Sequence, residues 1–175
     1  EGHNFYKLIL KDISNIYLVF QPTENFDEGL LFYAHNQGYL RAPNNYMVIR
    51  IQALVSFITF GRFLASQLVF SLLALTGAWR LFLFFYEQFP ALKKQFAIAI
   101  LFLPTFIFWS SGILKDSICV GALGWLTYSM YHLFYSRKNI LLNLCIVFFA
   151  GFLLYSLKVY ILVSYLPAIA LYLIM

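Results

Sequence analysis

Charged residues are scarce in this chain of 175 residues: Asp, Glu, Lys and Arg together make up 11% of it, whereas 62% of the residues are hydrophobic. Soluble domains carry roughly 25% charged residues. The shortage of charge therefore excludes an ordinary soluble domain and indicates an integral membrane protein. Long apolar runs follow one another after residue 46, and few charges interrupt them.

Cysteines and recognisable catalytic motifs are also rare. The two cysteines, Cys119 and Cys145, lie inside apolar runs and far apart in the sequence. We expect them to be small buried hydrophobic residues and not a disulfide or a metal pair. The sequence has no zinc-ligand spacing, Walker loop, dinucleotide fingerprint, Ser-His-Asp order or heptad repeat. Zinc proteins, P-loop and dinucleotide-binding proteins, hydrolases with a Ser-His-Asp triad and coiled coils are therefore disfavoured.

Acidic residues are concentrated in the first 45 residues. Residues 1–45 hold five acids against three bases, and the remainder holds two acids, Glu87 and Asp116, against nine bases. A polar arm beside a basic helical region explains this split, so nucleic acid is not expected as a partner. We divide the chain into an arm at 1–45, a helix at 46–61 and a membrane bundle at 62–175.

The apolar runs predict an all-α, polytopic transmembrane bundle with about five crossings. The arm carries turn residues between short apolar groups, so short helices and loops are expected there. The helix at 46–61 is interrupted by Arg50 and Gln52 and is too short to cross, which favours an interfacial or re-entrant helix. Pro104 is expected to be tolerated inside a crossing. The predicted crossings are 63–86, 96–114, 117–135, 140–157 and 159–175.

The placement of Lys and Arg predicts the orientation of the bundle. The turns at 87–95 and 136–139 each carry an adjacent pair of basic residues. By the positive-inside rule these two turns are cytoplasmic. The turns at 115–116 and 158 then lie on the extracytoplasmic side, together with the arm at 1–45. The chain begins without Met and ends inside an apolar run, so we expect a piece of a larger protein.

Lys115 and Asp116 stand side by side between two apolar runs, in FWSSGILKDSI. Ionisable residues at membrane depth are costly and are functional candidates by default. We interpret Lys115 as a cation for a phosphate, and Asp116 as a carboxylate that orients Lys115 or a sugar hydroxyl. The alternative is a lysine that reaches toward lipid head groups beside an aspartate that caps a helix at a tight turn.

Four further candidates lie on the same predicted side of the membrane. Lys158, in LLYSLKVYI, follows one hairpin later, and two lysines at one end of adjacent hairpins would attract a phosphate or pyrophosphate head group. The alternative is a lysine at the interface that only extends toward lipid head groups. Tyr160 could stack beside such a ligand, although an interfacial tyrosine needs no ligand. At the amino end, Glu1 and His3 could ligate a divalent cation or act as a base, although this signal is weak and a solvated terminus is the better explanation of both residues.

Two segments resemble a known family. The stretch AILFLPTFIFWSSGILKDSICVGALGWLTY is similar to a recurring segment of the GT-C superfamily of polytopic membrane glycosyltransferases, most closely in members from Bacteroidetes-type bacteria. The stretch LLYSLKVYILVSYLPA resembles the companion segment, in which a basic residue and an aromatic residue open the next helix. The resemblance covers residues 45–175, and the helix at 46–61 resembles the family's in-plane helix.

The resemblance implies an enzyme of the bacterial inner membrane that transfers sugar from a polyprenyl-phosphate-linked donor at the extracytoplasmic face. Glu1 stands where the family's acidic motif would end, as a base or metal ligand, so a divalent cation is a candidate cofactor. Lys115 and Lys158 match the positions of basic residues that hold the lipid phosphate. Membrane lipids and other membrane subunits are the further partners expected.

Two other functions fit the same residues. A polysaccharide polymerase or flippase would handle undecaprenyl-pyrophosphate sugars with similar groups. A non-catalytic membrane subunit would use the helices to anchor and pack a larger complex. An acidic pair after an apolar crossing, directly before Glu1 in a longer chain, would favour the transferase over the subunit.

Overall fold

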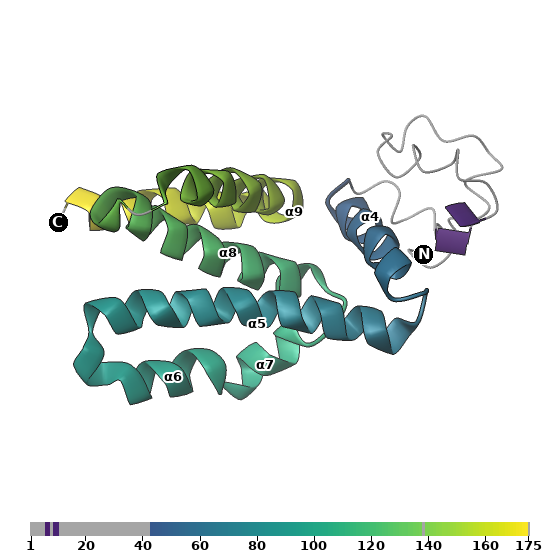
Figure 1. The fold of residues 1–175 in the computed structure, drawn as a ribbon, viewed down its shortest axis with the longest axis horizontal. Helices are drawn as coiled ribbons and strands as arrows, with labels where there is room; N and C mark the ends of the chain where they lie inside the picture. The colour runs from purple at the N-terminus through teal and green to yellow at the C-terminus, as the bar shows by residue number, and fades with distance from the viewer. Residues whose placement is uncertain (1–5, 8, 11–42, 138, 175) are drawn as a thin grey trace. The chain divides into compact units, whose positions relative to one another are not determined.

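The computed structural model describes residues 6–7, 9–10, 43–137 and 139–174. Figure 1 shows that most of these residues are helical, and no strand occurs among them, which confirms the predicted all-α class. The chain divides into two compact units, 1–69 and 70–175. The predicted catalytic Glu1 and the weak metal ligand His3 lie outside the described residues.

In the first unit, α4 (Pro43–Ile58) forms the helix that the sequence predicted as interfacial. Proline at the first position suits a helix start, because its missing amide hydrogen would have no helical partner. After α4, Phe60 and Gly61 adopt left-handed backbone angles, with φ of 52° and 69°. The buried hydroxyls of Thr59 and Ser66 lie 2.8 Å apart and hold this turn together. The position of α4 relative to a bilayer stays a prediction.

Two of the described helices are long and apolar enough to cross a membrane. They are α5 (Phe63–Gln88) and α9 (Ile140–Ile174). In α9 the candidate membrane span is Ile140–Tyr172. Only 28% of the most apolar window of each helix is buried inside the protein. Apolar surface exposed on this scale is unfavourable in water, which favours a lipid environment for both helices.

The prediction of about five crossings is not supported. The first difference is in the second predicted crossing, residues 96–114. There the chain forms two short helices, α6 (Lys93–Leu101) and α7 (Pro104–Ser110). Proline disfavours helical angles at the preceding residue, and Leu103 is extended, with φ of −67° and ψ of 120°. The short 3₁₀ turn η3 (Pro90–Leu92) joins α5 to α6.

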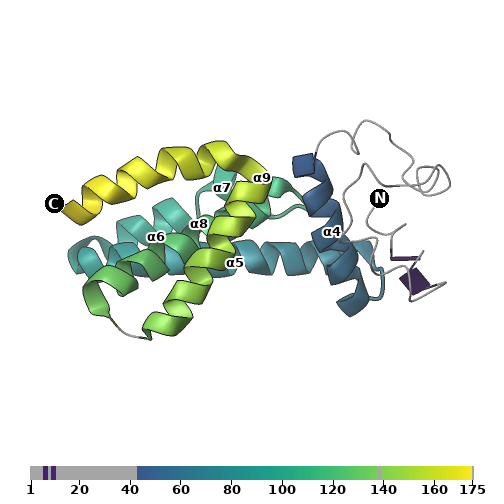
Figure 2. The ribbon, with the colours of Figure 1, turned by 90° about the horizontal axis from the view of Figure 1, so that it is seen from above.

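The later predicted crossings also differ from expectation. The helix α8 (Lys115–Tyr131) has 17 residues, fewer than the roughly 20 that a crossing needs, and ends in the π-helical turn η4 (His132–Ser136). The last two predicted crossings form one element, α9. Figure 2 shows α9 sharply bent, and its backbone is non-helical at Lys158, with φ of −149° and ψ of 80°. The prediction that Lys158 interrupts the helix is therefore confirmed.

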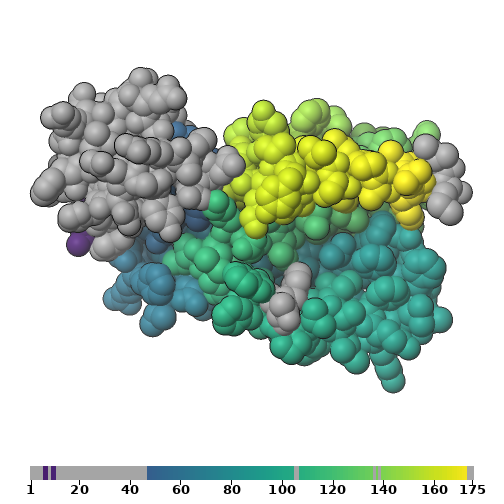
Figure 3. Space-filling view, turned by 180° about the vertical axis from the view of Figure 1, so that it is seen from behind, coloured from purple at the N-terminus to yellow at the C-terminus, as the bar shows by residue number. Residues whose placement is uncertain are grey.

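The second unit is built around α8, which lies between α5 and α9 (Figure 1). Gly77 of α5 approaches Gly121 and Gly124 of α8 so closely that a Cβ added to Gly124 would lie 1.9 Å from the Gly77 carbonyl oxygen. Small residues permit this approach, which is typical of helix pairs in membranes. Against α8, the Leu154 and Leu157 side chains of α9 are fully buried. Figure 3 shows the C-terminal half of α9, in yellow, on the outside of this unit.

Contacts in the second unit bring its turns together at two ends. At one end the start of α8 meets the bend of α9, where Asp116 contacts Lys158. At the other end the last turns of α5 and α8 meet the end of α9, where Phe84 and Tyr172 have ring centroids 5.7 Å apart. The alternation of turns agrees with the sequence prediction. Which end faces the outside of a cell stays a prediction.

Candidate functional site

A serine network positions the start of α8. The Ser117 hydroxyl, which is fully buried, donates a hydrogen bond of 2.6 Å to the Gly112 carbonyl oxygen. The Ser71 hydroxyl of α5 donates a bond of 3.0 Å to the Ser111 carbonyl oxygen. These bonds fix the WSSG turn against both α5 and α8, and so determine where Lys115 and Asp116 begin the helix.

Asp116 lies in the first turn of α8, where the unpaired backbone N–H groups favour a negative charge. Its Oδ1 atom contacts the Lys158 ammonium, which α9 supplies from its bend. The sequence interpretation was that Asp116 orients Lys115 or a sugar hydroxyl, and the structure pairs Asp116 with Lys158. Adjacent residues on a helix do not face each other, which explains why Lys115 is not the partner.

Lys158 also lies near Tyr160, with its Nζ atom 5.9 Å from the centre of the ring. The side chains of Lys158 and Asp116 are 21% and 36% exposed, so the ion pair remains open to solvent or to lipid head groups. The structure thus brings together three of the predicted residues, Asp116, Lys158 and Tyr160. Lys115 is half-buried in the same helical turn as Asp116.

The local charge favours an anion at this end of the unit. Two lysines and one aspartate leave one positive charge in excess. An ammonium has three hydrogen-bond donors, and Asp116 occupies one face of that group on Lys158. The ion pair holds the Lys158 ammonium in place, so that its remaining donors are available to an anion such as a phosphate.

The metal and cysteine expectations have separate outcomes. The described residues contain no group of three or more His, Cys, Asp or Glu side chains that could hold a metal ion. A role of Glu1 and His3 with a divalent cation stays a prediction, since both lie outside those residues. Cys119 and Cys145 are free thiols, and Cys119 is buried as predicted. The expectation of burial is wrong for Cys145, which is exposed on the apolar surface of α9.

A second polar cluster, which the sequence reasoning missed, occupies the opposite end of the unit. The Tyr128 hydroxyl donates to Glu87 Oε1 over 3.3 Å, and His132 Nε2 lies 3.3 Å from Glu87 Oε2. The Arg80 guanidinium lies 4.8 Å from the centre of the Tyr128 ring. The signal was present in the sequence: Arg80 and Glu87 are seven residues apart, and Tyr128 and His132 four apart, so each pair shares a helix face.

No protein-family model, curated protein or solved structure matches this chain. The chemistry of the site therefore rests on its own residues. The described part of the site is an ion pair of Asp116 and Lys158, with Tyr160 near Lys158 and Lys115 beside Asp116 on the helix. Sugar transfer would need in addition a base for the acceptor, and the predicted base, Glu1, is outside the described residues.

Proposed function

We propose that this chain is a membrane segment of a GT-C-like glycosyltransferase that uses a polyprenyl-phosphate-linked sugar donor. The observation that carries the proposal is the contact between Asp116 and Lys158. This contact joins segments 42 residues apart in the sequence and holds a lysine at the bend of an apolar helix. A charge retained at such a position favours a functional role.

Lys115 and Lys158 are the proposed phosphate ligands, and Tyr160 lies beside them. Inverting displacement would proceed by attack of an acceptor hydroxyl oxygen on the anomeric carbon, while the bond from that carbon to the lipid phosphate oxygen breaks. A carboxylate, proposed to be Glu1, would take the hydroxyl proton. The two lysines would stabilise the negative charge that develops on the departing lipid phosphate.

The proposed location is a bacterial inner membrane that the full protein crosses several times. The basic turns at 87–95 and 136–139 support a cytoplasmic position for that end of the unit. The end with Lys115 and Lys158 would then face outward, where a polyprenyl-linked donor presents its phosphate. Membrane lipids would surround α5 and α9, whose apolar surfaces are largely exposed.

A non-catalytic membrane subunit is the second candidate function. The close approach of Gly77 to Gly121 and Gly124 supports it, because tight helix packing is what an anchoring subunit requires. In that case the contact between Asp116 and Lys158 would lock α8 to α9 and bind no ligand. The two functions differ in whether the lysines bind a phosphate.

The test is native mass spectrometry of the purified chain with a polyprenyl phosphate. We expect one bound lipid, and about tenfold weaker binding in Lys115→Ala and Lys158→Ala, since each removes a charged hydrogen bond to the phosphate. Lys94→Ala is the matched control, because it removes the same charge from the opposite end of the unit. Undiminished binding in both site variants would leave the subunit as the better account.

A further inference from the structure

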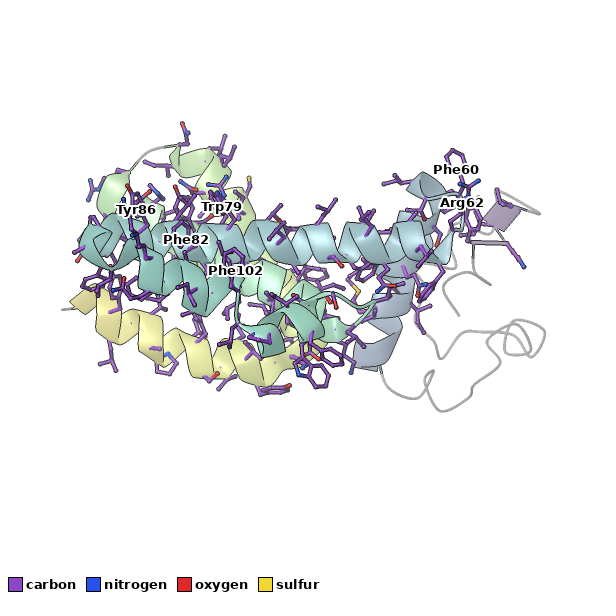
Figure 4. All side chains as sticks on the ribbon, turned by 90° about the horizontal axis from the view of Figure 1, so that it is seen from below. Phe60, Arg62, Trp79, Phe82, Tyr86 and Phe102 are labelled. Carbon is purple, nitrogen blue, oxygen red and sulfur yellow. The ribbon has the colours of Figure 1, made fainter. Side chains whose placement is uncertain are left out.

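A cavity of about 850 Å³ lies between α5, α8 and the break that separates α6 from α7. Its lining includes Trp79 and Arg80 of α5, Phe102 of the break, and Trp125 of α8. Figure 4 shows Trp79 and Phe102 on neighbouring elements of this part of the molecule. The volume falls within the range of about 300–1,000 Å³ that is typical of ligand sites.

The break before Pro104 shapes this cavity. A continuous helix over residues 96–114 would present a closed row of side chains to α5, but the chain instead ends α6 at Leu101. Leu101 and Phe102 line the cavity from the break, and the Phe102 side chain is 67% exposed. The lining is almost wholly apolar, which suits a hydrocarbon chain.

Arg80 is the one cation in this lining. Among the described residues no carboxylate lies within ion-pair distance of Arg80, whose guanidinium instead faces the ring of Tyr128 at 4.8 Å. Both oxygens of the nearby Glu87 carboxylate have other neighbours, Tyr128 and His132. The Arg80 guanidinium thus contacts Tyr128, through the ring face and a side-chain hydrogen bond, and the described residues place no carboxylate directly against its charge, which favours an anionic ligand.

Arg80 also lies at a suitable depth. It precedes the end of α5 at Gln88 by eight residues, or about 12 Å along the helix axis. A long arginine side chain can extend from there toward the head-group level. Two tryptophans, Trp79 and Trp125, line the same cavity, and their rings combine an apolar body with an N–H donor, as at membrane interfaces.

We propose that this cavity binds an anionic phospholipid of the surrounding bilayer, with the phosphate on Arg80 and an acyl chain in the apolar space. The site is separate from Lys115 and Lys158, which lie at the opposite end of the unit. The proposal requires a lipid environment around α5 but does not depend on sugar transfer. One guanidinium can donate two parallel hydrogen bonds to two oxygens of a phosphate, which explains an arginine in this place.

The experiment is quenching of tryptophan fluorescence by brominated lipids in bilayer discs that contain the full chain. Trp109→Phe serves as the parent, because it leaves Trp79 and Trp125 as the only tryptophans. We expect brominated phosphatidylglycerol to quench this parent at lower mole fraction than brominated phosphatidylcholine. Arg80→Gln in the same background is expected to reduce that preference about fivefold, the effect of one basic residue on anionic lipid binding.

Three comparisons keep the test decisive. Arg62→Gln removes an equal charge elsewhere and should keep the preference, whereas Arg80→Lys keeps the charge and should retain part of it. Thr76→Phe should fill the cavity and reduce quenching by both lipids. An unchanged preference in Arg80→Gln, or an equal loss in Arg62→Gln, would contradict the proposal. Relief of quenching by an equimolar polyprenyl phosphate would overturn the assignment to a phospholipid.

Discussion

At the scale of single residues, the two acidic side chains that follow residue 45 lie where helices meet. Glu87 and Asp116 are the two acids after residue 45, and each contacts a residue of another helix. Asp116 pairs with Lys158, and Glu87 contacts Tyr128 and His132. The sequence identified Asp116 and Lys158 as candidates but not as partners, because 42 residues separate them and only the bend of α9 brings them together.

Ser117 gives the sharpest test at this scale. Ser117→Ala should lower the free energy of unfolding by about 1 kcal/mol, because it leaves the Gly112 carbonyl oxygen without its buried donor. The measurement is thermal unfolding in detergent, followed by circular dichroism. Ser110→Ala is the control, since its hydroxyl makes only a local bond to the Ile107 carbonyl oxygen near the surface. Equal effects of the two variants would contradict the proposed role of the serine network.

The pair of Asp116 and Lys158 is tested by a double-mutant cycle. Asp116→Asn and Lys158→Met should each destabilise the fold, and together they should cost less than the sum, with a coupling of about 1 kcal/mol for a partly exposed pair. Urea unfolding in detergent provides the free energies. Asp116→Asn combined with Lys94→Met should instead be additive, because Lys94 lies at the other end of the unit. A coupling free energy of zero between Asp116 and Lys158 would contradict a stabilising contact between them.

At the scale of elements, composition predicts helices well and their continuity poorly. The runs 63–86 and 140–157 are confirmed as helix, since apolar length alone determines them. The run 96–114 is equally apolar, yet Pro104 divides it, and the sequence does not tell whether neighbouring helices compensate for a proline. The fit of Gly77 against α8 was also not predictable, because it depends on how the two helices cross.

Glycine packing between α5 and α8 provides a direct prediction. Gly124→Ala should destabilise the protein by about 2 kcal/mol, because the added methyl group would overlap the Gly77 carbonyl oxygen and force the helices apart. Gly151→Ala, in α9, is the matched control, since the described residues leave open space around an added Cβ there. Thermal unfolding in detergent compares the two. If Gly151→Ala is the more damaging change, the close approach of α5 and α8 is wrong.

At the scale of the whole molecule, the second unit is a helical assembly with two chemically different ends, and two of its helices are long and apolar enough to cross a membrane. One end holds Lys115, Asp116 and Lys158, and the other holds Arg80, Glu87 and the basic turns. The numbers of Lys and Arg in successive turns predicted which turns share an end, because turns with two basic residues alternate with turns that have one. It did not predict the contacts within each end, which depend on the breaks at Leu103 and Lys158.

The orientation is tested by labelling with a membrane-impermeant maleimide, after both native cysteines are replaced by alanine. Leu114→Cys and Ile140→Cys introduce one thiol at each end, at positions that are 40% and 53% exposed. In intact cells we expect Leu114→Cys to react, and Ile140→Cys to react only after the membrane is permeabilised. The reverse pattern would invert the orientation and place Lys115 and Lys158 on the cytoplasmic side.

The central claim is that the end with Lys115 and Lys158 holds the phosphate of a polyprenyl lipid. The most direct measurement uses a polyprenyl phosphate with a photoreactive group beside the phosphate, crosslinked to the chain in bilayers and mapped by mass spectrometry. We expect adducts concentrated in 109–117 and 155–161. Adducts concentrated in 87–95 and 132–139, or spread evenly along α5 and α9, would contradict it.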